Sequence, residues 1–250
     1  MKNLTFVGRD FGWFIGCLDN NIEHKHYAIQ LSIPLDSPIT VHADNHTITT
    51  QSPILIQPNI PHQIVSNTNH FLMLLNPAST VGHFWKKANS ESIGIYEENP
   101  AINLQLLLLQ VFTDSAHNQE IKQKINTYIN QYDCYCSSFL HKGDDRINKA
   151  LGFLQENTGR VVPLDEIASY SHLSTSRFLH LFKEQTGITY RRSQLWTKLT
   201  LAVQLLGKQT LTEIAYTAGF ADSAHFSRTF KENFGFSPQG FLKISQFIQA

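Results

Sequence analysis

The sequence Leu211-Thr212-Glu213-Ile214-Ala215 repeats Leu164-Asp165-Glu166-Ile167-Ala168, which lies 47 residues earlier. A second stretch, Phe226-Ser227-Arg228-Thr229-Phe230-Lys231-Glu232, repeats Phe178-Leu179-His180-Leu181-Phe182-Lys183-Glu184 at a spacing of 48. Each half of the repeat keeps a strict register, and one additional residue lies between the halves of the second copy. Two short helices joined by a turn would show this pattern, so the repeat predicts two helix-turn-helix units. A pair of such units can read two stretches of one duplex, which makes DNA binding the leading hypothesis.

The second helix of each unit is predicted to have one apolar and one polar face. Its phenylalanines are four residues apart, which places them on one buried stripe; they are Phe178, Phe182, Phe226 and Phe230. Ser174 and Asp222, 48 residues apart, are good N-caps for the two helices. The alternative is an ordinary helical repeat with solvated polar faces, but two copies are too few for a solenoid.

The polar faces supply the candidate DNA-binding residues. Those expected to read base edges are Ser176, Arg177 and His180 in the first unit and Ser223, His225 and Arg228 in the second. Those expected to contact mostly phosphates are Lys183, Arg191, Arg192 and Lys231. The two N-caps, Ser174 and Asp222, complete the set. Phosphate contacts position a protein on DNA and base contacts specify the sequence, so the two groups should respond differently to substitution.

Residues from about 144 to 245 resemble the DNA-binding domain of the AraC/XylS family of transcription regulators. The resemblance is carried by residues 164–168, 174–182 and 187–189, by Gly219-Phe220-Ala221-Asp222-Ser223-Ala224-His225-Phe226 and the residues up to 230, and by 234–238. It implies two helix-turn-helix units joined by one long helix, expected from Thr189 to Lys208, with each second helix in a major groove. The sequence departs from the family at Lys198, where Arg is usual. A lysine offers a point charge rather than a fork, so a pairing made there should differ in detail.

Charge and cysteine content agree with a DNA-binding protein once the chain is divided. The whole chain has a formal net charge of zero. Residues up to 142 contain eight Lys and Arg against eleven Asp and Glu, whereas those from 143 onward contain twelve against nine. The basic excess is therefore local and modest, and affinity should depend on two simultaneous contacts. Cys17, Cys134 and Cys136 form neither a disulfide framework nor the usual zinc knuckle. With no signal peptide or membrane-spanning apolar run apparent, we expect a cytoplasmic protein.

The N-terminal part reads as short strands followed by helices. The β-rich stretches are 27–33, 39–43, 54–56 and 71–75, with prolines between them, which suggests a small barrel or jelly roll. Three helices are expected at 80–87, 101–114 and 120–131. The last two have apolar stripes that suit either self-association or the covering of the barrel, and both alternatives remain open.

A second resemblance concerns His24, His26, Gln30 and His62. The spacing of these four residues is similar to the cupin pattern, in which His-x-His, a glutamate four residues later and a more distant histidine bind a metal. Two histidines at i and i+2 on a strand point the same way, so a shared ligand set is geometrically allowed. Here Gln30 replaces the glutamate and is a poorer ligand, and Asn59 stands where cupins usually have Gly. We expect no metal or other cofactor, and interpret the four residues as the lining of an effector pocket.

The sequence therefore predicts an α+β multidomain protein. Residues 1–136 should form a cupin-like β-barrel with flanking helices for effector binding and dimerisation, 137–143 a linker, and 144–250 an all-α domain of two helix-turn-helix units. The predicted function is a sequence-specific DNA-binding transcription regulator, not an enzyme, that is controlled by a small molecule or by homodimerisation. Its expected partners are double-stranded DNA and, for an activator, RNA polymerase. The alternative is a cupin-type metal-binding protein or enzyme with a helical appendage.

Overall fold

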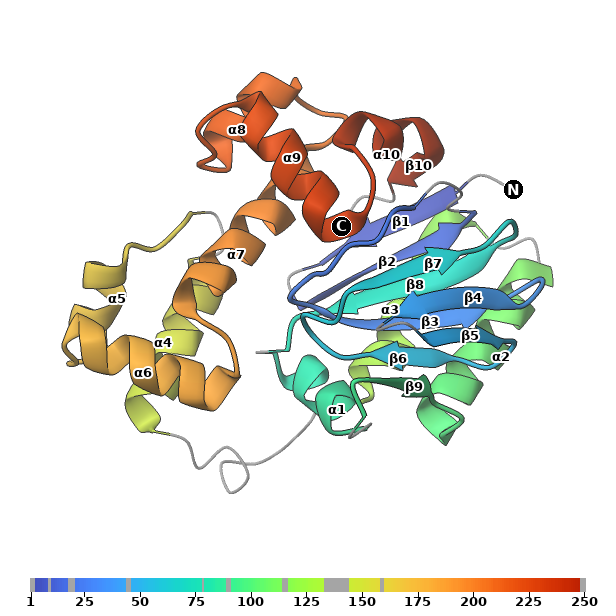
Figure 1. Cartoon of the computed structure of the whole chain (residues 1–250), viewed down its shortest axis with the longest axis horizontal. Helices are drawn as coiled ribbons and strands as arrows, with labels where there is room; N and C mark the ends of the chain where they lie inside the picture. The colour runs from blue at the N-terminus through green and yellow to red at the C-terminus, as the bar shows by residue number, and fades with distance from the viewer. Residues whose placement is uncertain are drawn as a thin grey trace. The chain divides into compact units, whose positions relative to one another are not determined.

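The computed structural model describes residues 3–8, 10–17, 21–43, 46–77, 79–88, 91–113, 117–132, 144–157 and 160–247 (Figure 1). The chain divides into two units, one of residues 1–134 with 228–250 and the other of residues 135–227. The first contains the sheets, and the second is helical. The expected linker at 137–143, with Cys134 and Cys136, lies outside the described residues. Among the described helices, none is long and apolar enough to cross a membrane.

The first unit contains two β-sheets. The larger has the strand order β10-β1-β2-β8-β3-β6-β9 and the smaller the order β5-β4-β7. All neighbouring strands are antiparallel except β1 and β10, which are parallel. The strands are β1 (Asn3–Val7), β2 (Phe11–Gly16), β3 (Ile29–Pro34), β4 (Ile39–Ala43), β5 (His46–Thr50), β6 (Ile54–Ile56), β7 (His62–Val65), β8 (His70–Leu75), β9 (Ile93–Ile95) and β10 (Ser245–Phe247).

The predicted β-rich N-terminal region is confirmed, but its sheets are not closed into a barrel. A closed barrel needs every strand to pair on both sides. Among the described strands, β9 and β10 end the larger sheet, and β5 and β7 end the smaller one. Side chains join the two sheets instead, because Ile54 and Ile56 of β6 pack in one buried cluster with Ile39, Val41 and Ile64 of the smaller sheet.

Three helices cover the larger sheet and confirm the helices expected there: α1 (Thr80–Ala88), α2 (Asn99–Thr113) and α3 (Asn118–Asn130) (Figure 1). Their stripes, which include Leu104 and Leu108 of α2 and Ile125 of α3, are buried in one core with Trp13 and Phe71 of the sheet. The Trp13 indole N–H also donates to Asn126 Oδ1 at 2.8 Å. These stripes therefore cover the sheet, which was one of the two alternatives left open.

The C-terminal region is helical, as predicted, apart from β10 at its end. Its helices are α4 (Asp145–Glu156), α5 (Leu164–Tyr170), α6 (Thr175–Thr186), α7 (Tyr190–Leu205), α8 (Leu211–Thr217), α9 (Ser223–Phe234) and α10 (Pro238–Ile244). The linking helix α7 is shorter than expected. It has 16 residues, or about 24 Å at 1.5 Å per residue. Thr189 caps its N-terminus, and the backbone leaves the helix at Leu206 before Gly207 adopts a φ of 80°.

Candidate nucleic-acid interface

Helix α6 is held on its apolar side by an aromatic cluster. The rings of Phe178 and Phe182 meet the ring of Tyr190 edge-on, with centroids 5.2 and 5.3 Å apart. All three side chains are buried, and the Tyr190 hydroxyl donates to the Val162 carbonyl oxygen at 2.7 Å. Burial raises the pKa of Tyr190 to about 12, so the phenol keeps its proton and its hydrogen bond. The predicted phenylalanine stripe of the first unit is therefore confirmed.

The turns of the two helix-turn-helix units have matching geometry. The Leu173 N–H donates to the Ala168 carbonyl oxygen at 2.9 Å, and the Phe220 N–H donates to the Ala215 carbonyl oxygen at 2.8 Å. His172 (φ 52°) and Gly219 (φ 74°), 47 residues apart, both adopt the left-handed conformation. Histidine tolerates this conformation better than most residues do, so the first unit forms the same turn without glycine.

The additional residue of the second copy is Ala221. The helix caps lie 48 residues apart, because Ser174 Oγ accepts from the Arg177 N–H at 3.3 Å and Asp222 Oδ1 accepts from the His225 N–H at 2.7 Å. The turn bonds before them are 47 apart, which leaves Ala221 between Phe220 and Asp222. The Ala221 N–H donates to His225 Nδ1 at 3.3 Å. His225 is thus half-buried and supports this turn, and its other ring nitrogen carries the proton.

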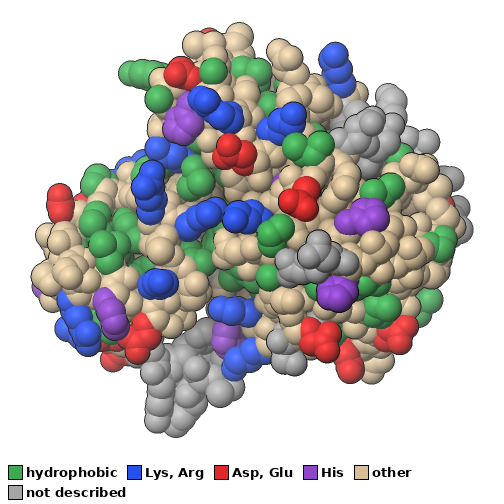
Figure 2. Space-filling model, viewed as in Figure 1, with side chains coloured by type: hydrophobic (Ala, Val, Ile, Leu, Met, Phe, Trp, Pro, Cys, Tyr) green, Lys and Arg blue, Asp and Glu red, His purple; other side chains and the backbone are tan. Residues whose placement is uncertain are grey.

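The structure leaves nearly all of the predicted DNA-binding side chains exposed. On α6 and just before it these are Ser174, Ser176, Arg177, His180 and Lys183, and at the start of α7 they are Arg191 and Arg192. In the second unit Asp222, Arg228 and Lys231 are exposed, and Ser223 and His225 are half-buried. On the face drawn in Figure 2, the Lys and Arg side chains occur singly and in small groups rather than as one continuous patch. This agrees with the modest basic excess.

Two acids lie near α6: Glu184 in the helix itself, as the sequence showed, and Asp144, which was not anticipated. A hydrogen bond from Arg146 lowers the pKa of Asp144 to about 2, and the charge of Arg177 contributes to the shift. On α6 itself, His180 Nδ1 lies 3.6 Å from Glu184 Oε2. Arg177 therefore has a carboxylate nearby with which DNA phosphates or bases would compete.

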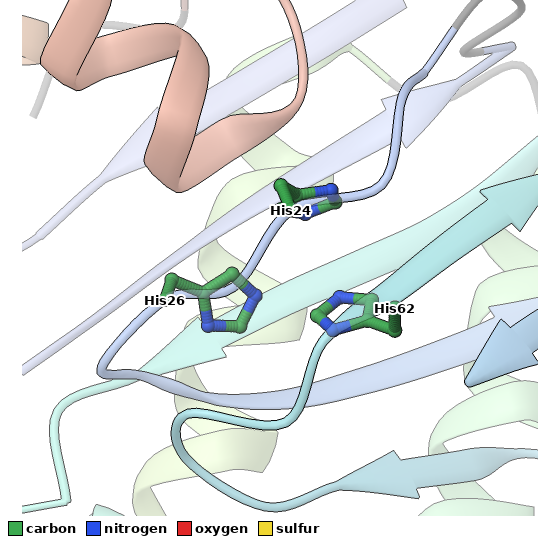
Figure 3. Close-up of side chains that lie close together, drawn as sticks. All are labelled: His24, His26 and His62. Carbon is green, nitrogen blue, oxygen red and sulfur yellow. The ribbon is translucent and has the colours of Figure 1, made fainter. Parts of the chain in front are cut away.

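A separate cluster of imidazoles lies in the unit that contains the two β-sheets, residues 1–134 with 228–250. His24 and His26 precede β3 in an extended segment, and His62 begins β7 (Figure 3). His24 and His62 pair through two backbone hydrogen bonds of 2.9 Å. The three ring centroids lie 4.5, 5.1 and 5.6 Å apart, and all three side chains are buried. The four residues singled out together in the sequence are thus brought together in space, since Gln30 contacts two of these rings.

The hydrogen bonds of the cluster fix its protons. The Nδ1 atoms of His24, His26 and His62 lie 2.8–2.9 Å from the backbone carbonyl oxygens of Ile22, Ala28 and Ile60 respectively. A carbonyl only accepts, so each Nδ1 carries a hydrogen. Burial lowers the pKa of His24 to about 4 and that of His62 to about 2, and it also lowers the pKa of His26. The rings are neutral, and each Nε2 presents a lone pair.

Comparisons with known proteins identify the helical region. A helix-turn-helix domain family model matches residues 167–244. The chain is 25% identical to the probable transcriptional regulator LumQ of Photobacterium leiognathi over 226 residues, which cover 86% of this chain and 88% of LumQ. It is 34% identical to the transcriptional activator RhaS of Escherichia coli over 102 residues, a match that spans only 37% of RhaS. These matches support the resemblance of the helical region to the DNA-binding domain of AraC/XylS transcription regulators.

Solved structures support the same fold for the whole chain. Apo ToxT of Vibrio cholerae, as the K231A variant, superposes with a TM-score of 0.62 at 14% identity over 95% of this chain and 98% of ToxT. This likeness shows a fold with an N-terminal β-rich part and a C-terminal helical part. Because the matched relatives are named as transcriptional regulators, the alternative of a cupin enzyme with a helical appendage is not favoured.

The sequence departs from the AraC/XylS family pattern at Lys198, and the structure shows which groups this lysine contacts. Its Nζ donates to the carbonyl oxygen of Gly219 and lies 5.7 Å from the centroid of the Phe220 ring. The linking helix α7 is thereby fixed to the turn of the second unit by one charged donor. The sequence indicated that a pairing at Lys198 would differ from the family's, but it did not identify the partner, which lies 21 residues away.

Proposed function

We propose that this DNA-binding regulator reads its promoter through residues of both recognition helices. The observation that carries this proposal is the matched turn geometry of the two units, which presents the polar faces of α6 and α9 in the same way. Ser176, Arg177 and His180 are assigned to one block of bases, and Ser223, His225 and Arg228 to the other. Arginine bidentate to guanine is the commonest specific contact, so Arg177 and Arg228 should dominate.

Base reading and phosphate contact are separable by experiment. Arg228→Ala should cost about 1–3 kcal/mol of binding free energy on the preferred site and relax the sequence preference. Lys231→Ala should weaken binding to all sequences similarly and flatten the salt dependence. Fluorescence anisotropy at several salt concentrations, on the preferred and on a scrambled duplex, distinguishes the two effects. If both variants keep the wild-type preference and salt slope, the assignment is wrong.

The N-terminal unit is proposed to be the regulatory part. Its two facing sheets support a cupin-like sandwich, and its most unusual polar feature is the cluster of His24, His26, Gln30 and His62. One ToxT structure contains a bound unsaturated fatty acid, which is a precedent for ligand binding in this fold. We assign signal binding to the cluster. DNA affinity that is insensitive to every substitution in the cluster, under all signal conditions, would contradict the assignment.

Homodimerisation is a further part of the proposal. The stripe of α2 is buried against the sheet, but Leu106 and Leu109 on the other side of this helix are 60% and 40% exposed. Exposed leucines on one helix favour a second copy as partner. Analytical ultracentrifugation should show a dimer that Leu106→Glu weakens. A wild-type monomer at all concentrations used for DNA binding would exclude this role. An activator would also contact RNA polymerase from the promoter-bound state.

A further inference from the structure

The amide of Gln30 meets two lone pairs in the histidine cluster. His26 Nε2 lies 2.8 Å and His62 Nε2 lies 3.2 Å from Gln30 Oε1, while Gln30 Nε2 donates to Ser32 Oγ at 3.1 Å. Because both Nδ1 atoms already carry the ring hydrogens, neither Nε2 can donate to this oxygen. Three acceptor atoms therefore face one another inside the protein, where unpaired polar atoms are costly. Two arrangements resolve the conflict.

In the first arrangement the amide is turned over, so that its NH2 group donates to both rings and its oxygen accepts from Ser32. In the second a cation lies between the lone pairs, as in a metal centre. Either orientation of the amide keeps a hydrogen bond with Ser32, so this bond does not choose between them. The donor set does favour a cation, because each ring has its Nδ1–H held by a backbone carbonyl. That is the usual outer-shell arrangement of metal-binding histidines.

The dimensions of the cluster suit a single ion. One ligand atom from each histidine lies within 4.8 Å of the other two. A point therefore exists within about 2.8 Å of all three nitrogens, and Zn–N bonds are about 2.0–2.1 Å long. Ring movements of less than about 1 Å would complete the coordination. The rings are buried and contact one another, so an organic molecule would not fit between their nitrogens without separating them.

We propose that His24, His26 and His62, with the amide oxygen of Gln30, bind one divalent transition-metal ion. Neutral imidazoles suit zinc, copper, iron and nickel, whereas magnesium and calcium prefer oxygen ligands. The inference rests on the proposed function in one respect, since it makes the ion the signal that the N-terminal unit senses. The ion takes the place of the small-molecule effector that was expected from the sequence.

Through Ile22, the cluster is also connected to the residue that follows α9, within the same unit. The carbonyl oxygen of Ile22 accepts from the His24 ring, and the N–H of Ile22 donates to the carbonyl oxygen of Gly235 at 3.2 Å. Gly235 follows α9 and has a φ of 80°. A Cβ atom there would overlap Asn21 Oδ1 and lie 2.8 Å from His24 Nδ1. An ion that fixes the His24 ring therefore acts on the segment that holds the end of α9.

The test uses the full chain, freed of affinity tags and stripped with chelator. Zn²⁺ binding is measured by competition with a chromogenic chelator, and Co²⁺ binding by its visible absorption spectrum. We expect one equivalent of metal, and a spectrum that indicates nitrogen ligands. His62→Ala should weaken binding by at least about 100-fold, since loss of an outer-shell partner alone costs about 10–100-fold. His42→Ala is the matched control, because His42 is an exposed imidazole on β4 and should leave binding unchanged.

The Gln30→Glu substitution distinguishes the two arrangements, and this test does not require that any histidine variant folds. At a metal centre a carboxylate oxygen should tighten Zn²⁺ binding by about tenfold or more and keep one equivalent. In the turned-amide arrangement the carboxylate cannot donate to either ring, so the variant should lose stability without gaining affinity. No metal binding in the wild type, or equal loss in His42→Ala, overturns the proposal.

DNA binding is measured on the same samples, and it separates this inference from the proposed function. We expect Zn²⁺ to change wild-type affinity for the preferred duplex by at least about threefold and to leave His62→Ala unaffected. If the protein binds metal but its DNA affinity does not change, the sensory role is refuted and the metal site itself is supported. Absence of specific DNA binding with and without metal would instead refute the proposed reading of DNA.

Discussion

The matched turns of the two units lead to a prediction about backbone strain. Gly219→Ala should destabilise the second unit, because φ is 74° there and an alanine in the left-handed region costs about 1–2 kcal/mol. The new Cβ itself would meet only the Lys198 side chain, at 3.6 Å from Cε, which is an ordinary contact. The alanine also lowers the conformational entropy of the unfolded chain, which stabilises the folded protein by about 0.4–1 kcal/mol. The expected net loss is therefore about 1 kcal/mol.

Two further substitutions control for this value. His172→Gly, at the equivalent position with φ 52°, relieves strain but frees the unfolded chain, so it should change stability by less than about 0.5 kcal/mol. Gly152→Ala in α4 has open space around the new Cβ and should gain about 1 kcal/mol from helix propensity. Urea unfolding followed by circular dichroism measures all three. A Gly219→Ala protein as stable as wild type would refute the equivalence of the turns.

The remaining predictions concern packing, groove spacing and pH. Phe230→Ala removes a buried ring and should cost about 3–5 kcal/mol, whereas Arg228→Ala should leave the melting temperature nearly unchanged; equal melting curves would contradict the helical stripe. Helix α7 spans about 24 Å, less than the roughly 34 Å between successive major grooves on one face, so the DNA should bend toward the protein and circular-permutation gel shifts should detect the bend. Burial lowers the pKa of His70 to about 4. The unfolded imidazole takes a proton near pH 6.5 and the folded one does not, so stability should fall from pH 6.5 toward 4. His70→Leu should flatten this slope by up to about 1.4 kcal/mol per pH unit, and an unchanged slope would exclude His70 as its source.

Much of the helical region could be predicted from the sequence because its determinants are local. The phenylalanine spacing and the N-caps Ser174 and Asp222 each depend on residues within one or two helical turns. The inserted residue was placed correctly in the turn, but its identity as Ala221 required the hydrogen-bond register. The end of α7 was predicted one turn late, because Leu206 fits the apolar stripe and only the backbone at Gly207 shows the break.

The N-terminal region was predicted less completely because strand pairing depends on distant residues. The apolar stretches found β3, β4, β6 and β8, but the pairing of β1 with β10 joins residues more than 240 positions apart. A small barrel or jelly roll was expected from short strands at regular spacing, whereas closure depends on which strands pair at the sheet edges. The cluster of His24, His26, Gln30 and His62 was predicted as a group. The orientation of its lone pairs needed the backbone carbonyls that hold each Nδ1.

The central claim is that both helix-turn-helix units read one DNA site. The most direct measurement is selection of bound duplexes from a random pool by the wild type, Arg177→Ala and Arg228→Ala, followed by sequencing. We expect two short blocks about one helical turn apart in the wild-type motif. Arg177→Ala should relax one block and Arg228→Ala the other. A wild-type motif with a single block, or a motif that neither substitution alters, would contradict the claim.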